Sequence, residues 1–183
     1  MFFDRWRARR ANRLLIDQIH GEIVAAARAT ELYRVLGVPD DIDGRFEMVV
    51  VYAGLVLRRL GELGEPARPW AQDVVDRVFV SFDDALRELT FSDARVAKRI
   101  KAMAEAFFGR NAVYHAALAV ENPRILAEAL ARNVYRGRVE ADAAPPRLLA
   151  ERILAAARAL EAADLETFAA GGFHFREGQG AVT

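Results

Sequence analysis

The stretch MVVVYAGLVL, Met48–Leu57, decides the fold. It is apolar on every side, so a helix built on it has no polar face to turn towards water. Such a helix has to be packed by neighbours all round, and this makes it the centre of a helical domain. The stretch is far shorter than the roughly 20 residues that a membrane span requires. We therefore expect a central helix from about Arg45 to Leu60.

Helical periodicity extends outward from this stretch over almost the whole chain, while β-branched alternation is hard to find. The other helices are expected over residues 2–29 with a further turn to 36, 69–89, 92–108, 111–120, 123–136 and 147–163. Gly109 is expected to break the helix that Ser92 caps, and Asn122-Pro123 to start the next one. The sequence thus predicts an all-α fold, a single compact domain of about seven or eight helices over residues 1–176, with a flexible tail over 177–183.

The composition excludes several classes of protein. The chain has 183 residues, which is enough to bury about 70% of the surface that its unfolded form exposes. Cysteine is absent, so disulfides and thiolate metal sites are excluded. The 26 Lys and Arg residues balance the 26 Asp and Glu residues, so we expect no specific nucleic-acid partner. The Arg-rich start passes into mixed sequence without the apolar segment of a secretory signal, and the bacterial cytoplasm is the expected location.

No residue pattern indicates catalysis, a metal or a cofactor. His20, His115 and His174 are far apart and lie outside any zinc-binding motif. The acids of the 40–43 linker fail the pattern of a calcium loop, which needs an acid where Pro39 stands. Their carboxylates suit the positive N-terminal end of the next helix instead. We expect no catalytic residue, no metal and no cofactor, and a binding protein rather than an enzyme.

Two segments are suited to binding. The first is SFDDALRELTFSDARVAKRIKAMAEAFFGR, Ser81–Arg110, in which acidic side chains precede a short break and basic side chains follow it. The break would bring both signs of charge to one corner beside Phe107 and Phe108. The solvated surface of an ordinary helical protein explains such a run of charges equally well, so both interpretations stand.

The second segment is the N-terminus, MFFDRWRARRANR. At 100° per residue, its aromatic side chains point about 130° away from the apolar stripe of residues 15–23, with arginines beside them. An aromatic patch rimmed by arginine is typical of a membrane-surface segment or of a protein-docking patch. The alternative is that the aromatics fold back onto a neighbouring helix. The residues of this expected membrane or partner surface are Phe2, Phe3, Trp6, Arg9, Arg10 and Arg13.

Several motifs resemble those of one family, the ubiquinol–cytochrome c chaperones, which are assembly factors of the cytochrome bc1 complex. The family pattern LRE…D…V.K..K…FYGR corresponds here to Leu86-Arg87-Glu88, Asp93, Val96, Lys98, Lys101 and Phe107-Phe108-Gly109-Arg110. The similarity extends from Phe2-Phe3-Asp4-Arg5-Trp6, through Leu32-Tyr33-Arg34 and Asp43-Gly44-Arg45-Phe46-Glu47, to Ala117-Leu118. Two departures are that Phe108 replaces the usual tyrosine, and that Thr90 and Ser92 replace glycines of the break.

The resemblance implies a non-enzymatic chaperone that binds newly made cytochrome b and holds it for haem insertion and assembly. The resemblance also implies that mitochondrial relatives act near the ribosome exit, on the matrix face of the inner membrane. We therefore expect peripheral contact of this protein with the inner membrane or the ribosome. The expected contacts with the client are Arg87, Glu88, Asp93, Lys98, Lys101, Phe108 and Arg110. The main alternative is a helical adaptor that docks another protein. A second is a small hydrolase or transferase, which would need a closed pocket with His20 or His115 beside carboxylates.

Overall fold

The structure is a computed structural model that describes residues 2–89 and 92–175, with side chains from residue 10 onward. Within these ranges it has no strand, in agreement with the predicted all-α class. The elements are α1 Phe2–Ala27, α2 Thr30–Arg34, α3 Ile42–Glu62, η1 Glu65–Ala67, α4 Arg68–Glu88, α5 Asp93–Ala119, α6 Pro123–Asn133, α7 Ala144–Glu161 and α8 Leu165–Ala169. The expected tail, 177–183, lies outside the described residues.

Helix α3 is the central element, as its apolar sequence predicts. It packs against α1, α4, α5 and α7, and every residue from Phe46 to Val56 is buried. One aromatic contact ties it to α4, where the ring centroids of Phe46 and Phe82 lie 5.1 Å apart, and another ties α4 to α5, where those of Phe79 and Phe107 lie 5.4 Å apart. The core therefore runs continuously from α3 through α4 to α5.

The starts of two helices follow from local chemistry. The Asp41 side chain accepts a hydrogen bond from the Gly44 N–H at 2.8 Å and so caps α3. At α6, the Asn122 side chain accepts from the Arg124 N–H at 3.0 Å, and Pro123 occupies the first helical position. The cap at Asn122 confirms the predicted start at Asn122-Pro123, whereas α3 begins at Ile42, within the 40–43 linker and three residues before the predicted Arg45, because Asp41 caps it there.

The expected break at Gly109 is wrong, because α5 runs without interruption from Asp93 to Ala119. Gly109 is exposed and sits in regular helix, where a single glycine costs only about 1 kcal/mol relative to alanine. Ser92 does occupy the N-cap position of α5, but its side chain makes no capping hydrogen bond.

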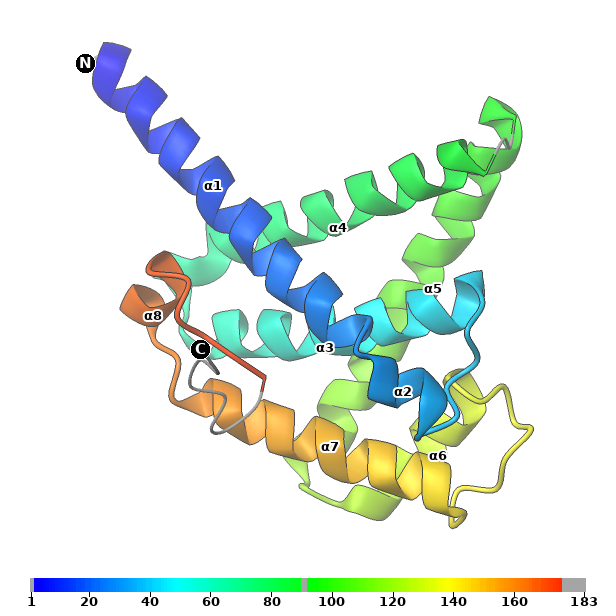
Figure 1. Cartoon of the computed structure of the whole chain (residues 1–183). Helices are drawn as coiled ribbons and strands as arrows, with labels where there is room; N and C mark the ends of the chain where they lie inside the picture. The colour runs from blue at the N-terminus through cyan, green and yellow to red at the C-terminus, as the bar shows by residue number, and fades with distance from the viewer. Residues whose placement is uncertain (1, 90–91, 176–183) are drawn as a thin grey trace.

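Two parts of the molecule project from the bundle on opposite sides. Figure 1 shows α3, α6 and α7 grouped together, while α4 and the start of α5 form an antiparallel arm that extends away from them. The N-terminal part of α1 also extends away from the bundle, and α1 crosses α4 further along its length, before it reaches α2. None of the described helices is long and apolar enough to cross a membrane. The space where α1 and the arm diverge from α3 contains the candidate site.

Candidate functional site

Four helices, α1, α3, α4 and α5, enclose a cleft of about 490 Å³. Its wall is mostly apolar, with polar groups along its edges. The apolar lining residues are Val24, Ile42, Phe46, Val49, Phe82, Ala85, Leu86, Leu89 and Met103, and the polar ones are His20, Arg28, Arg45, Ser81 and Glu88. The amphipathic stripes of the helices thus continue past the closed core into an open hollow.

Large apolar side chains at this cleft remain exposed to solvent. Ile42, the first residue of α3, is 42% exposed, and Leu89, just after α4, is 49% exposed. Behind them, Phe46 and Phe82 are buried and in mutual contact. Exposed apolar residues that line a concave surface with a polar rim are typical of a site that binds another apolar surface.

The polar residues at the cleft carry both signs of charge. Arg28 and Arg45 come from the ends of α1 and α3 that adjoin it, and Glu88 comes from the last turn of α4. Arg45 donates to the Asp40 carboxylate at 2.7 Å on the exposed surface. The cleft can therefore hold an apolar segment and contact polar groups on either side of it.

His20 and Ser81 form a link between α1 and α4 at the cleft. The Ser81 hydroxyl donates its proton to the Val78 carbonyl at 2.7 Å, so His20 Nε2, 3.0 Å from Ser81 Oγ, is the donor of that bond. A nucleophile–base pair needs the opposite direction, with the hydroxyl donating to the imidazole. Burial, and then the charge of Arg77, lower the pKa of His20 to about 4, so the ring is neutral at pH 7.

The other histidine of the enzyme alternative lies elsewhere. His115 Nε2 is 3.0 Å from the Gly54 carbonyl, in the contact between α5 and α3. The carboxylate three residues before His20, that of Asp17, accepts from Arg77 at 2.7 Å. The arrangement that would indicate a hydrolase, an imidazole beside a carboxylate in a closed pocket, is therefore not formed by either residue.

Three of the sequence-predicted contacts meet at the tip of the arm. The Arg87 guanidinium donates to Asp83 and to Asp93, each at 2.5 Å, and so connects the end of α4 to the start of α5. Glu88, the next residue, lines the cleft. A corner of mixed charge is thus present in Arg87, Glu88 and Asp93, but its cation comes from before the break and not from the basic residues that follow it.

The other four predicted contacts do not join this corner. Lys98, Lys101 and Phe108 are exposed on the outer side of α5, where Phe108 is 58% exposed. Arg110 turns inward: its guanidinium binds the buried Glu47 carboxylate at 2.7 Å and lies 5.5 Å from the centre of the Phe46 ring. The reason is the 100° turn per residue, which places Arg110 on the side of α5 that faces α3.

The predicted surface at the N-terminus is described only in part. The side chains of Phe2, Phe3, Trp6 and Arg9 lie outside the described residues, while those of Arg10 and Arg13 are exposed. The helix that carries them projects away from the bundle (Figure 1). The assignment of this surface to a membrane or a partner stays a prediction.

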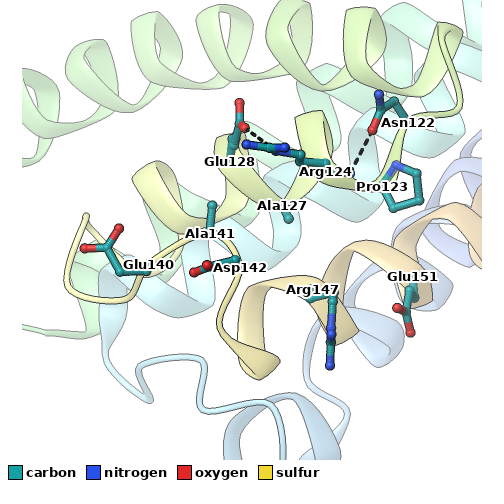
Figure 2. A pocket seen from close by; sticks show the side chains of 10 residues that line it. All are labelled: Asn122, Pro123, Arg124, Ala127, Glu128, Glu140, Ala141, Asp142, Arg147 and Glu151. Atoms are coloured by element: carbon teal, nitrogen blue, oxygen red, sulfur yellow. Dashed lines mark hydrogen bonds and ion pairs between the residues drawn. The ribbon is translucent and has the colours of Figure 1, made fainter.

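A second, larger hollow of about 700 Å³ lies between the start of α6, residues 140–142 and α7. Figure 2 shows that its charged side chains do not converge: the Arg124–Glu128 ion pair on α6, at 3.3 Å, lies apart from Arg147 and Glu151 on α7, which point away from it. Its other contacts include the small residues Ala127 and Ala141. We assign the candidate site to the smaller cleft because large exposed apolar side chains gather there.

Sequence reasoning missed the cleft itself. Helical periodicity places Leu86, Leu89 and Met103 on the apolar stripes of their helices, which are the faces expected to be buried. Leu89 is exposed instead, and Met103 is half-buried. One sequence feature could have indicated the cleft: the apolar stripe of α4 continues to the end of that helix. In the structure, the neighbouring helices do not cover this end.

The comparisons with known proteins agree with this architecture. Residues 34–175 match the family model described as ubiquinol-cytochrome C chaperone. The crystal structure of the Cbp3 homolog from Brucella abortus is similar to the chain with a TM-score of 0.84 and 32% sequence identity, over 97% of each chain. The search of curated proteins gives no match. The chain belongs to the ubiquinol-cytochrome C chaperone family.

Proposed function

We propose that this protein binds newly made cytochrome b and supports assembly of the ubiquinol–cytochrome c reductase (bc1) complex, and that the cleft holds an apolar segment of that client. The observation that carries the proposal is the exposure of Ile42 and Leu89 above the buried Phe46–Phe82 pair. Membership of a chaperone family implies a protein client. A subunit that is destined for the membrane offers apolar helices that need cover before they are inserted.

The size of the cleft suits a transient hold. A volume of about 490 Å³ takes a few side chains from one face of a client helix and not the whole helix. Apolar burial contributes on the order of 25 cal/mol per Å², so a contact of this kind is reversible. A chaperone has to release its client for assembly, and a shallow apolar site meets this need.

The charged residues near the cleft would orient the bound client segment. Glu88, from the last turn of α4, lines the cleft together with Arg28 and Arg45, from the ends of α1 and α3. A client segment with polar ends would pair with both signs of charge and thereby fix its register. Electrostatic matching of this kind contributes to specificity and to the rate of association more than to affinity.

The outer side of α5 is a second proposed contact region. Lys98, Lys101 and Phe108 lie there, away from the side of α5 that faces α3. One straight client helix does not reach both the cleft and this side of α5. We therefore rank the cleft as the primary site, and the tip residue Asp93 as the link between the two regions.

Site-specific photo-crosslinking in cells tests this assignment. The photoreactive amino acid benzoylphenylalanine is placed at Leu89 in the cleft, at Phe108 on the outer side of α5, and at Leu148 on α7. Leu148 is the matched control, because it is also large, apolar and 42% exposed, but lies outside the cleft. We expect the Leu89 probe to crosslink to cytochrome b and the Leu148 probe to give no such product.

The outcomes separate the candidate functions. A product at Phe108 without one at Leu89 would move the client site to the outer side of α5. In that case the double charge reversal of Lys98 and Lys101 to glutamate should abolish co-purification of cytochrome b from membranes. Capture of a soluble protein at Leu89 in place of cytochrome b would support a general adaptor instead.

The N-terminal segment is proposed to lie on the membrane surface while the client is held. The exposed Arg10 and Arg13 suit anionic headgroups. Sedimentation with vesicles that contain 30% anionic lipid should carry the native chain down, and removal of residues 2–10 should abolish this. Equal sedimentation of both chains would exclude the segment as the membrane contact.

A further inference from the structure

The second half of α5 carries a long exposed face without charge. The exposed residues from Phe108 to Val120 are all apolar or glycine, and they recur three or four positions apart, so they share one side of the helix. At 1.5 Å per residue this side extends over about 18 Å. We call it the outer face of α5, and its residues are Phe108, Gly109, Ala112, Val113, Ala116, Ala119 and Val120.

Large apolar side chains on the outer face lie in solvent. Phe108 is 58% exposed, Val113 is 40% exposed and Val120 is 60% exposed. The Phe108 ring is held in place by an edge contact with the ring of the buried Phe107, at 5.4 Å between the centroids. The neighbours of α5, which are α3, α4 and α6, pack on its other side. An uncovered apolar face of this kind indicates an interaction surface.

The middle of the outer face is low, because its residues are small. Gly109 lies inside regular helix, where glycine is a poor helix former. A Cβ atom at Gly109 would meet no atom within 4 Å, so nothing in the chain itself requires glycine there. Together with the alanines that follow it, Gly109 forms a strip onto which a second helix can pack closely.

The order of large and small side chains is complementary to itself when two copies of α5 pack antiparallel. In an antiparallel pair, one residue forward on one helix is one residue back on the other. A register that covers the whole outer face places Phe108 against Ala119 of the second copy, and Val120 against Gly109. The remaining alanines meet at the centre. Each contact occurs twice, because the interface of a two-fold dimer is formed by the same surface of both chains.

The charges at the end of the outer face also match in this register. Glu105 is exposed and forms no ion pair with any residue that the structure describes. It would lie beside the start of α6 in the second copy, since Pro123 follows Val120 by three residues. The first turn of α6 has no acidic side chain, and its Arg124 is 87% exposed. A carboxylate is favourable at the N-terminal end of a helix and next to an arginine.

We infer that a second copy of this chain packs antiparallel on the outer face of α5 and forms a two-fold dimer. The face is smaller than a standard interface, so the dimer is weak and its population rises with concentration. The dimer covers Phe108, and it therefore excludes a client from that contact; this consequence rests on the proposed function, but the dimer itself does not. The cleft stays open in the dimer, because Met103 lines it from the opposite side of α5.

Sedimentation velocity of the full native chain, from micromolar to millimolar concentration, measures the dimer without any client. We expect the sedimentation coefficient to rise from the monomer value towards the dimer value. Ala112→Glu places a carboxylate at the centre of the interface in both copies and should keep the chain monomeric at every concentration. Ala155→Glu is the matched control, because Ala155 is an exposed alanine of α7, and it should behave as the native chain does. Circular dichroism checks that both variants are helical.

An exchange of charges identifies the second copy as the occupant. Glu105→Arg alone and Arg124→Glu alone each bring like charges together at both ends of the interface, and each should weaken the dimer about tenfold. An equal mixture of the two variants should recover the native association, because each chain then offers the charge that the other one needs.

A native chain that is monomeric at every concentration would overturn the proposal and leave the outer face to a different protein, such as the client. A dimer that persists in Ala112→Glu would place the interface elsewhere and overturn it as well. A mixture that associates no better than either variant alone would overturn the antiparallel register. None of these results bears on the crosslinking test at Leu89, which concerns the opposite side of α5.

Discussion

The same substitution, glycine to alanine, should stabilise this protein at one helical position and not at another. Gly54 lies in the middle of α3 and Gly109 in the middle of α5. In both helices alanine gains about 1 kcal/mol in helix propensity. At Gly109 the new Cβ would meet no atom within 4 Å, so the gain is kept. We expect Gly109→Ala to raise the free energy of unfolding by about 1 kcal/mol.

At Gly54 the new Cβ would meet Asn111 Oδ1 at 2.0 Å and Cγ at 3.2 Å. Asn111 is only 6% exposed, so its amide has no free space to enter, and α5 has to shift. Overpacking of this kind costs about 1–3 kcal/mol. Because the propensity gain is common to both variants, it cancels in their difference. Gly54→Ala should therefore be about 1–3 kcal/mol less stable than Gly109→Ala.

Urea unfolding at pH 7, followed by far-ultraviolet circular dichroism, measures this difference. Thermal unfolding should agree, with about 2–4 °C for each kcal/mol in a chain of this length. Adding Asn111→Ala to Gly54→Ala removes the colliding amide and should recover a large part of the lost stability. Equal stability of the two single variants would refute the close approach of α3 and α5. A loss of stability in Gly109→Ala would refute the continuity of α5.

Three further predictions concern single residues. Burial raises the pKa of Glu47 from its ordinary value to about 7. The free energy of unfolding of the native chain should therefore fall by up to about 3 kcal/mol as the pH rises from 4.5 through 7, and Glu47→Gln should lack this slope. The same slope in Glu47→Gln as in the native chain, measured by urea unfolding at several pH values, would contradict the prediction. Tyr135 donates to the Leu36 carbonyl at 2.6 Å in the interior, so Tyr135→Phe should lower the free energy of unfolding by about 1–3 kcal/mol; a neutral result would show that the carbonyl finds another donor. The Asp41 carboxylate caps α3 through the Gly44 N–H, so Asp41→Ala should cost about 1 kcal/mol in thermal unfolding, and no change would mean that the cap contributes nothing.

The elements of the fold could be predicted from the sequence where local chemistry decides them. The stretch Met48–Leu57 is apolar on all sides, and no arrangement of helices leaves it at the surface. Asn122-Pro123 combines a side-chain acceptor with a residue that has no N–H, and α6 starts at this point. The predicted break at Gly109 is wrong because a single glycine does not by itself end a helix. The turns of α5 before and after Gly109 pack against neighbouring helices, and α5 continues through it.

The site could be predicted only in part, because its residues meet through the crossing of helices. Arg87 and Asp93 are six positions apart, and their ion pair across the break reverses the charge order of the sequence, in which acidic side chains precede the break and basic ones follow it. Glu47 and Arg110 are far apart in sequence, and nothing within either motif indicates that one binds the other. The cleft gathers residues from His20 to Met103, and its existence depends on the angles between four helices. Periodicity gives the faces of helices and not these angles.

The central claim is that this protein holds cytochrome b for assembly, with Leu89 at the mouth of the cleft. Its most direct test is the amount of spectrally visible cytochrome b and of assembled bc1 complex in membranes from cells that lack the gene. The account predicts that both fall, that the native gene restores both, and that a stably folded Leu89→Glu variant does not. Normal cytochrome b and normal bc1 complex in the deletion strain would contradict it.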